Sequence, residues 1–258
     1  MIGLLPRRVL PVLMYHRIGE VGQADPSLTV TPPTFARHLD WINARGFRTL
    51  SLDEAHDAFR SRRFPRRSVL LTIDDGFDET LRTAAPLLAA AGQRATVFVP
   101  SGLLGREARL EPSYGGSQAH RPVSGSIVDG AGLTAWVNAG HGVGSHSLTH
   151  ADLTKISAAE AAREATESKR LLEDLLGREI LDFCYPYAHH DPAARQAARA
   201  AGYRAAYAGE PPTQSLWALP RMMVFPDDSE RRFARKLYGY YYWLSAWHKR
   251  VLRTSDEQ

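Results

Sequence analysis

A single cysteine, Cys184, is present in the 258 residues, so no disulfide can form within the chain and nothing ties the protein to an oxidising compartment. No apolar stretch is long enough to span a bilayer. The N-terminus carries Arg7 and Arg8 after a very short apolar patch, whereas a signal peptide has a basic start followed by a longer apolar stretch. These absences make a cytoplasmic location the expectation.

Internal repeats and linkers are also missing, and 44% hydrophobic with 23% charged residues is an ordinary globular composition. We therefore expect a single domain. The net charge of +4 would suit nucleic acid, anionic lipid or phosphorylated substrates, but no known nucleic-acid motif accompanies the basic residues. The positive surplus is instead concentrated in residues 221–253, where lysines and arginines outnumber acidic residues.

Two short segments carry the candidate chemistry. Residues 71–76 form an aliphatic and β-branched run that ends in Asp74, Asp75 and a glycine, which is typical of a buried strand that brings acids to the edge of a sheet. His146 and His150 stand four positions apart, so one helical turn would point both imidazoles the same way. One carboxylate and two imidazoles can bind a metal and leave positions open for water and substrate. With a second carboxylate beside them, the pattern predicts a metal-dependent hydrolase.

Strand patterns alternate with helix patterns along the chain, which indicates parallel βαβ units in an α/β fold. Residues 101–132 are rich in Gly, Ser and Pro and are expected to form a long loop. The number of strands does not decide between a closed barrel and an open doubly wound sheet. The expected strands cover residues 9–14, 69–73, 95–99, 143–145, 181–185 and 203–208, and the expected helices end before Gly46, Gly92, Gly177 and Gly202.

Taken alone, the acidic pair is also compatible with a solvated turn, and the two histidines with unrelated positions. Together they resemble the acidic motif (with Ile73 where phenylalanine is usual) and the His-x-x-x-His motif of the polysaccharide deacetylase family, the NodB-homology group or carbohydrate esterase family 4. Three weaker matches stand in the family's order around them, and the resemblance covers about residues 9 to 224. They are Leu-Met-Tyr-His at 13–16, Tyr-Pro-Tyr at 185–187 and Leu-Pro-Arg at 219–221.

The resemblance implies a distorted (β/α) barrel of the NodB-homology type, with the site at the carboxyl ends of its strands. It implies that Asp75, His146 and His150 bind the metal and that Asp74 is the general base. It also assigns to Tyr187 a backbone N–H that binds the oxyanion. Zinc is favoured because imidazole with carboxylate suits it, although cobalt or nickel fits the same geometry.

The sequence departs from the family pattern at two places that matter for catalysis. Cys184 stands where an arginine usually orients the base, and Arg221 is our candidate to replace that arginine. Cys184 itself is expected to be a buried structural thiol rather than a ligand or a nucleophile. The last motif lacks the histidine that often serves as general acid. His16, at the end of the first strand, is the candidate for that role, with His189 and His190 as alternatives.

Residues 229–258 follow the expected barrel of residues 1–228, and they hold apolar residues at helical spacing with basic residues between them. Such a basic amphipathic helix either makes peripheral contact with an anionic membrane, through residues 230–253, or packs across the bottom of the barrel. If it binds the membrane, the substrate is a lipid-linked sugar at the inner face. The apolar positions are Phe233, Leu237, Tyr240, Tyr241, Leu244, Trp247 and Val251.

The sequence therefore predicts an enzyme that hydrolyses the N-acetyl group of an amino sugar in a bacterial surface polysaccharide or a lipid-linked glycan precursor. An O-acetyl esterase, or a hydrolase of amides unrelated to sugars, would use the same fold and site. A non-catalytic carbohydrate-binding protein is a third hypothesis, but a pure binder has no need of a base beside a metal. The identity of the sugar and the oligomeric state are left open.

Overall fold

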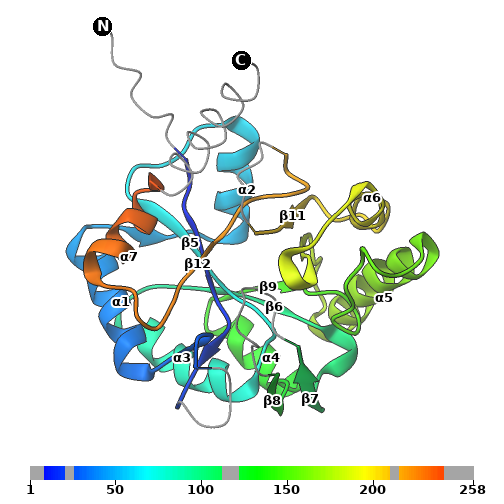
Figure 1. The fold of residues 1–258 in the computed structure, drawn as a ribbon, viewed down its shortest axis with the longest axis horizontal. Coiled ribbons are helices and arrows are strands. Elements are labelled where there is room, and N and C mark those ends of the chain that lie inside the picture. Colours follow the sequence, from blue (N-terminus) through cyan, green and yellow to red (C-terminus); the bar gives the residue numbers. More distant parts are fainter. Residues whose placement is uncertain (1–8, 21–25, 112–121, 210–214, 241–258) are drawn as a thin grey trace, which may run out of the picture.

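A curled sheet of parallel strands lies at the centre of the protein (Figure 1). The computed structural model describes residues 9–20, 26–111, 122–209 and 215–240. The strand order is β11-β10-β9-β6-β5-β1-β12, and β4 also pairs with β5. This is the α/β class and the distorted barrel that the sequence predicts. The strands are β1 (Val12–Tyr15), β4 (Arg48–Thr49), β5 (Ser68–Ile73), β6 (Thr96–Val99), β9 (Gly142–Ser145), β10 (Asp182–Cys184), β11 (Ala205–Tyr207) and β12 (Met222–Met223).

The burial of β5 explains the aliphatic and β-branched sequence that precedes Asp74. All of its residues are buried, and it pairs with β1 along residues 70–73. Its first residues also pair with β4 and its last residues with β6. A parallel strand with neighbours on both sides, helices on its outer face and the barrel interior on its other face has no solvent-exposed side, so it is built mainly from a run of aliphatic and β-branched residues. That run ends where the acids begin.

Helices cover the outside of the curled sheet (Figure 1). Ser157 and Glu160 form a capping box at the start of α5 (Ala158–Leu176), and Gly177, the expected stop, ends that helix in the left-handed conformation, at φ 62°. Among the described residues, no helix has both the length and the apolar character needed to cross a bilayer. The helices are α1 (Pro32–Ala44), α2 (Leu52–Ser61), α3 (Asp78–Ala90), α4 (Gly130–Asn138), α5 (Ala158–Leu176), α6 (Pro192–Ala200) and α7 (Glu230–Leu237), with short 3₁₀ turns η1 (Ser101–Leu103) and η2 (Pro186–Ala188).

The stretch between β11 and β12 brings the last strand back to the first. Ala206 donates its N–H to the Leu216 carbonyl, and Leu219 donates to the Ala206 carbonyl, each at 2.8 Å. The chain then continues into β12, which pairs with β1 at Met222 and Met223. Residue 221 lies between these two pairings and is therefore placed inside the barrel rather than on its surface.

The expectation of one long loop over residues 101–132 is wrong in part. This stretch contains η1 and an antiparallel hairpin of β7 (Glu107–Leu110) and β8 (Val123–Ser126), and α4 begins within it. The apolar residues Leu110 and Val123 pack in a cluster with Phe77. β8 reads Val-Ser-Gly-Ser, and its Gly125 allows the Phe77 ring to approach. The small residues that permit this close packing also have the composition of a loop. The composition of residues 101–132 therefore predicted a loop where a strand is present.

The start of the expected C-terminal helix packs against α1. Phe233 is fully buried, and its ring stacks on His38 with the centroids 4.4 Å apart. Lys236 is also buried and donates to the Met223 carbonyl at 2.7 Å and to the Asp228 carboxylate. One face of residues 230–237, formed by Phe233, Lys236 and Leu237, therefore belongs to the protein's core. The remaining positions from Tyr241 to Val251 lie outside the described residues, so the helix and the domain boundary predicted there stay predictions.

Candidate active site

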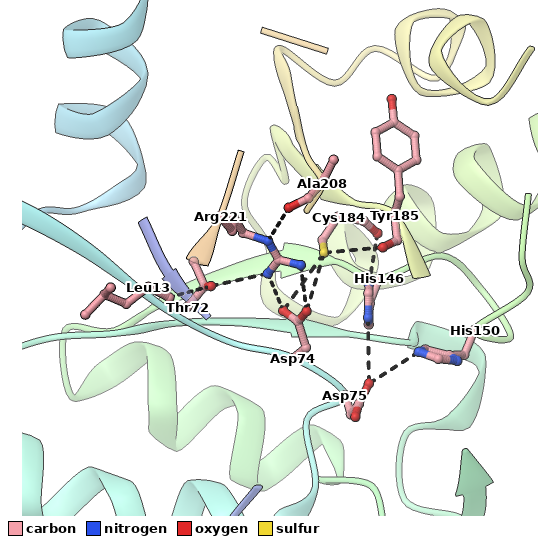
Figure 2. A network of polar contacts seen from close by, with 10 residues as sticks. All are labelled: Leu13, Thr72, Asp74, Asp75, His146, His150, Cys184, Tyr185, Ala208 and Arg221. Atoms are coloured by element: carbon pink, nitrogen blue, oxygen red, sulfur yellow. Dashed lines mark hydrogen bonds and ion pairs between the residues drawn. The ribbon is translucent and has the colours of Figure 1, made fainter. Parts of the chain in front are cut away.

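The acidic pair lies at the carboxyl end of β5, where the chain turns sharply. Asp74 still donates its N–H to the Tyr15 carbonyl at 2.9 Å, as a strand residue does. Asp75 and Gly76 then both adopt a φ of 70°. This reversal sends the two adjacent carboxylates to different partners, Asp74 to Arg221 and Asp75 to the two imidazoles (Figure 2). A side chain at position 76 would not fit, since an added Cβ would lie 2.5 Å from Cγ1 of Val99.

His146 and His150 follow β9, but they are not on a helix as the sequence analysis expected. Ser147 and His150 have positive φ angles, each 63°, which a helix does not allow. The two rings nevertheless approach each other, with centroids 4.9 Å apart. Their Nε2 atoms lie 3.7 and 3.3 Å from Oδ1 of Asp75 (Figure 2). The structure thus brings the three predicted ligands together through a loop and not through helical spacing.

The chemistry of these three groups fits a divalent metal ion. Two ligand atoms bound to one zinc at about 2.1 Å are about 3.0–3.5 Å apart, close to the spacing found here. Oδ1 of Asp75 and Nε2 of His150 are buried, yet they have no hydrogen-bond partner among the described residues. Nδ1 of His146 is 2.9 Å from the Cys184 carbonyl, which fixes the ring and leaves Nε2 facing Asp75. Burial lowers the pKa of His146 to about 4, so its imidazole is neutral and able to act as a ligand.

A second group of metal-ligand types, Asp74, His146 and Cys184, also lies close together. Two facts argue against it as a metal site. Burial raises the pKa of the Cys184 thiol well above its usual value, and a metal ligand must be the thiolate. The carboxylate of Asp74 is already engaged, because both of its oxygens accept hydrogen bonds from Arg221. Asp75, His146 and His150 are therefore the better set.

Arg221 reaches the interior of the barrel from the segment before β12. Its Nη1 and Nη2 donate to Oδ1 and Oδ2 of Asp74, both at 2.7 Å, and its Nε donates to the Ala208 carbonyl at 3.0 Å (Figure 2). Arg221 is 1% exposed and also bonds the Thr72 hydroxyl. Burial opposes ionisation of Asp74, but Arg221 and His146 outweigh it, and the pKa of that carboxyl is held well below its usual range. Asp74 is therefore an oriented, ionised carboxylate.

A family model described as "Polysaccharide deacetylase" matches residues 61–206, which is more than half of the chain. The chain belongs to the polysaccharide deacetylase family. It is therefore one of the hydrolases that act on amide bonds. The matched range contains the acidic pair, the two histidines and Tyr187, whereas His16 and Arg221 lie outside it.

Relatives and solved structures agree with this assignment. YxkH of Bacillus subtilis (strain 168), named as a polysaccharide deacetylase, is 26% identical over 229 residues, which cover 87% of this chain and 74% of the relative. The Streptococcus pyogenes deacetylase PplD in complex with acetate has a TM-score of 0.76 at 23% identity, over 89% of this chain and 99% of that one. IcaB from Ammonifex degensii has a TM-score of 0.72 at 24% identity, over 90% of this chain and 97% of that one. At these identities the solved structures show the shared fold.

Cys184 of this deacetylase is fully buried at the end of β10. Its Sγ lies 3.9 and 3.8 Å from the two carboxylate oxygens of Asp74, beside the Arg221 guanidinium (Figure 2). An arginine at position 184 would compete with Arg221 for the same carboxylate. The small neutral thiol of Cys184 thus leaves room for Arg221, which reaches the carboxylate from the segment before β12.

Of the three histidines considered for the acid role, His16 is the one whose electrostatic influence reaches both Asp74 and Asp75. It is 4% exposed, and its charge lowers the pKa of both Asp74 and Asp75. His189 instead bonds the Asp152 carboxylate through Nδ1 at 2.9 Å. His190 packs against the ring of Tyr185, with centroids 5.4 Å apart. The acid role of His16 stays a prediction, but its position agrees with that role.

Tyr187 lies in the 3₁₀ turn that follows β10, with φ 59° and ψ 9°. Ala188 is also left-handed, at φ 54°. The Tyr187 ring packs against His150, with centroids 4.9 Å apart. Two consecutive non-glycine residues with positive φ are strained, and such strain is concentrated at functional sites. This turn places Tyr187 next to His150, one of the three predicted metal ligands.

One buried group that contacts the site is not among the residues predicted from the sequence. Glu164 is 3% exposed and accepts hydrogen bonds from the segment between the two histidines. The helical periodicity of the sequence could have revealed Glu164, because positions 161, 164, 165, 168 and 172 recur at helical spacing and form the buried face of α5. A carboxylate on the apolar face of an amphipathic helix is unusual and marks a group with a specific partner.

Proposed function

We propose that this polysaccharide deacetylase is a metal-dependent enzyme that removes the N-acetyl group from an amino sugar of a bacterial surface glycan. One observation carries the proposal: neighbouring carboxylates are assigned to different tasks by their contacts. Both oxygens of Asp74 are oriented by Arg221, while Oδ1 of Asp75 faces two imidazole nitrogens without a hydrogen bond. A binding protein has no need of this division.

The residues at the site divide the hydrolysis between them. A divalent metal bound by Asp75, His146 and His150 would supply Lewis acidity toward the acyl carbonyl and lower the pKa of water. Asp74 takes a proton from the attacking water, and the oxygen of that water bonds to the carbonyl carbon. The Tyr187 N–H donates to the oxyanion that forms. His16 then protonates the amine as the C–N bond breaks, which leaves acetate and a free amino sugar.

Acetate release from N-acetylglucosamine oligomers, with metal content measured on the same samples, tests the proposal. Chelation should abolish release, and zinc, cobalt or nickel should restore it. Asp74→Asn should lower turnover by about 10²–10⁴-fold with metal still bound, since general-base catalysis contributes about that factor. Asp75→Asn should lose both metal and activity, and Asp78→Asn, on the outer start of α3, should resemble the wild type. Release from O-acetylated sugars alone would instead identify an esterase.

Contact with a membrane is a second, separable proposal. The end of α7 lies at the amino end of the strands: Tyr238 packs its ring against Phe47, which directly precedes β4, with centroids 5.2 Å apart. Asp74 lies at the opposite, carboxyl end of β5. Membrane contact through residues 230–253 would therefore turn the active site away from the bilayer. We infer that an enzyme bound at the inner face would act on a glycan extending from the membrane and not on the first sugar of a lipid carrier.

Flotation of the full chain with liposomes containing anionic lipid tests the membrane proposal. The variant Lys249→Ala/Arg250→Ala/Arg253→Ala should float less, because each basic residue near an anionic surface contributes about 1 kcal/mol. Truncation before α7 is unsuitable as a control, since Phe233 and Leu237 are part of the core. Equal absence of binding by both proteins would contradict membrane contact.

A further inference from the structure

The segment between His146 and His150 is irregular, so its backbone N–H groups need partners from outside the segment. Glu164, on α5, is that partner. Its Oε2 accepts from the N–H of Leu148 and from the N–H of Thr149, both at 2.9 Å. Its Oε1 accepts from the Thr149 hydroxyl at 2.8 Å. One buried carboxylate thus takes all three hydrogen bonds from the middle of the metal-binding loop.

The carbonyl groups of the same loop accept hydrogen bonds from η1 and α5. The Ser147 carbonyl accepts from the N–H of Ser101 at 3.1 Å and from the hydroxyl of Ser168 at 2.9 Å. The Leu148 carbonyl accepts from the N–H of Gly102 at 2.7 Å. An added Cβ on Gly102 would lie 2.8 Å from that carbonyl oxygen, so the approach is as close as a glycine permits. The loop is therefore fixed between η1 and α5.

A carboxylate is an expensive choice for this position if its purpose is only to pack the helix. Among the described ion pairs, Glu164 has one partner, Arg163, at 3.9 Å. Burying a carboxylate without a close cation costs several kcal/mol unless hydrogen bonds compensate. The rest of the buried face of α5 is small or apolar, with Ala161, Ala165 and Leu172. The carboxylate is accounted for by the three bonds that it accepts from the loop.

We propose that Glu164 is a positioning residue of the metal site, which holds residues 147–149 in the conformation that turns both imidazoles toward Asp75. The inference rests on the proposed function only in taking Asp75, His146 and His150 as the ligands. Glu164 acts through the loop backbone, where a left-handed Ser147 and a left-handed His150 replace the helical turn that would otherwise align the rings. Removing the carboxylate frees the backbone to relax and separates the imidazoles.

Binding of Zn²⁺ and Co²⁺ to the full chain, by calorimetry and by cobalt absorption, tests this role without any substrate. Glu164→Ala should weaken metal binding by about 10–100-fold, the range found when groups that orient metal ligands are removed. Glu164→Gln should bind nearly as the wild type does, because its carbonyl can accept from both N–H groups and its amide can donate to the Thr149 hydroxyl. The matched control is Glu167→Ala, on the same helix, whose carboxylate pairs only with the exposed Arg163 among the described ion pairs.

Amide hydrogen exchange of the metal-free proteins gives a second readout. The N–H groups of Leu148 and Thr149 should exchange slowly in the wild type and in Glu164→Gln, and much faster in Glu164→Ala. If the alanine variant does not fold, Glu164→Asp, which withdraws the carboxylate by one methylene, takes its place. Wild-type metal affinity in a folded Glu164→Ala, or equal loss in the alanine and glutamine variants, would overturn the proposal. Failure of every protein to bind metal would instead refute the proposed metal site and, with it, the need to position it.

Discussion

Arg221 and Asp74 form a two-bonded ion pair across 147 residues of sequence, with each Nη donating to its own carboxylate oxygen at 2.7 Å. The pair is almost completely buried. Arginine suits this position because its planar guanidinium matches a carboxylate, whereas lysine offers a point charge. The geometry fixes both the ionisation and the direction of the Asp74 carboxylate, which we propose as the general base.

Loss of this pair should affect stability and catalysis together. Arg221→Ala should destabilise the fold by about 3–5 kcal/mol, since it leaves a buried carboxylate uncompensated. Arg221→Lys keeps the charge but not both bonds, so it should retain most of the stability and lose most of the turnover. Denaturant unfolding and acetate release measure the two effects. Arg82→Ala, which removes an exposed pair with Asp78, is the control and should change stability by at most about 1 kcal/mol. Wild-type turnover in Arg221→Lys would contradict an orienting role.

The position of His16 predicts a different combination of effects. His16→Ala should lower turnover sharply on N-acetylated sugars and leave metal content and folding unchanged, because the residue is beside the carboxylates but is not one of the three ligands. Steady-state kinetics with metal analysis of the same preparation decides this. His56→Ala, on α2, is the matched control. Unchanged kinetics in His16→Ala would contradict the acid role of His16 and favour His189 as the general acid.

Alanine substitutions at Gly76 and Gly92 should distinguish the cost of a left-handed backbone from the cost of a steric clash. Gly76 and Gly92 both have positive φ, at 70° and 64°, but an added Cβ at Gly76 meets Val99 at 2.5 Å, while at Gly92 it meets nothing within 4 Å. Gly92→Ala should cost about 1–2 kcal/mol of stability, from the left-handed conformation alone. Gly76→Ala should cost about 2–4 kcal/mol, because overpacking adds to the strain. It should also lower activity, since the turn carries Asp75. Equal losses in the two variants would show that the contact with Val99 relaxes freely.

Acid should destabilise the protein through His38, a residue far from the chemistry. Burial, Lys236 and Arg37 lower the pKa of His38 to about 3, against about 6.5 in an unfolded chain. Between these values the unfolded state binds the extra proton, so the free energy of unfolding falls as pH falls from about 6.5 toward 3, by up to about 1.4 kcal/mol per pH unit for one site. His38→Asn keeps an acceptor for the Tyr15 hydroxyl and cannot take up the proton.

Denaturant unfolding at several pH values compares the two proteins. The asparagine variant will start from a lower stability, because it loses the stacking on Phe233. Its stability should nevertheless depend less on pH in this range than that of the wild type. Parallel pH dependences would show that other groups cause the loss in acid.

The sequence predicted the parts of this protein that local rules determine. Uninterrupted aliphatic strands such as β5 and capped helices such as α5 follow from periodicity and N-cap chemistry, and both are confirmed. The partner of Asp74 is less local: Arg221 was proposed because an expected arginine is absent at Cys184, and only the tertiary structure shows the two bonds. The sequence provided the residue but not its geometry.

Other features had no local cause that a pattern could reveal. The spacing of His146 and His150 suits a helix, yet the backbone there is fixed by Glu164 and Ser168 from α5 and by η1. The hairpin β7–β8 is stabilised by packing on Phe77 and not by strand propensity. Tertiary contacts decided the conformation in both places, which is why composition and spacing misled.

Arg221, the charge partner of Asp74, lies near the end of the described chain, directly before β12, the strand that pairs with β1. A nascent polypeptide that has already emerged through both acids and both histidines therefore still lacks the counter-charge of Asp74. Docking of the final strand completes the ion pair of Asp74, so the carboxylate that we propose as the base is oriented only when the barrel is complete.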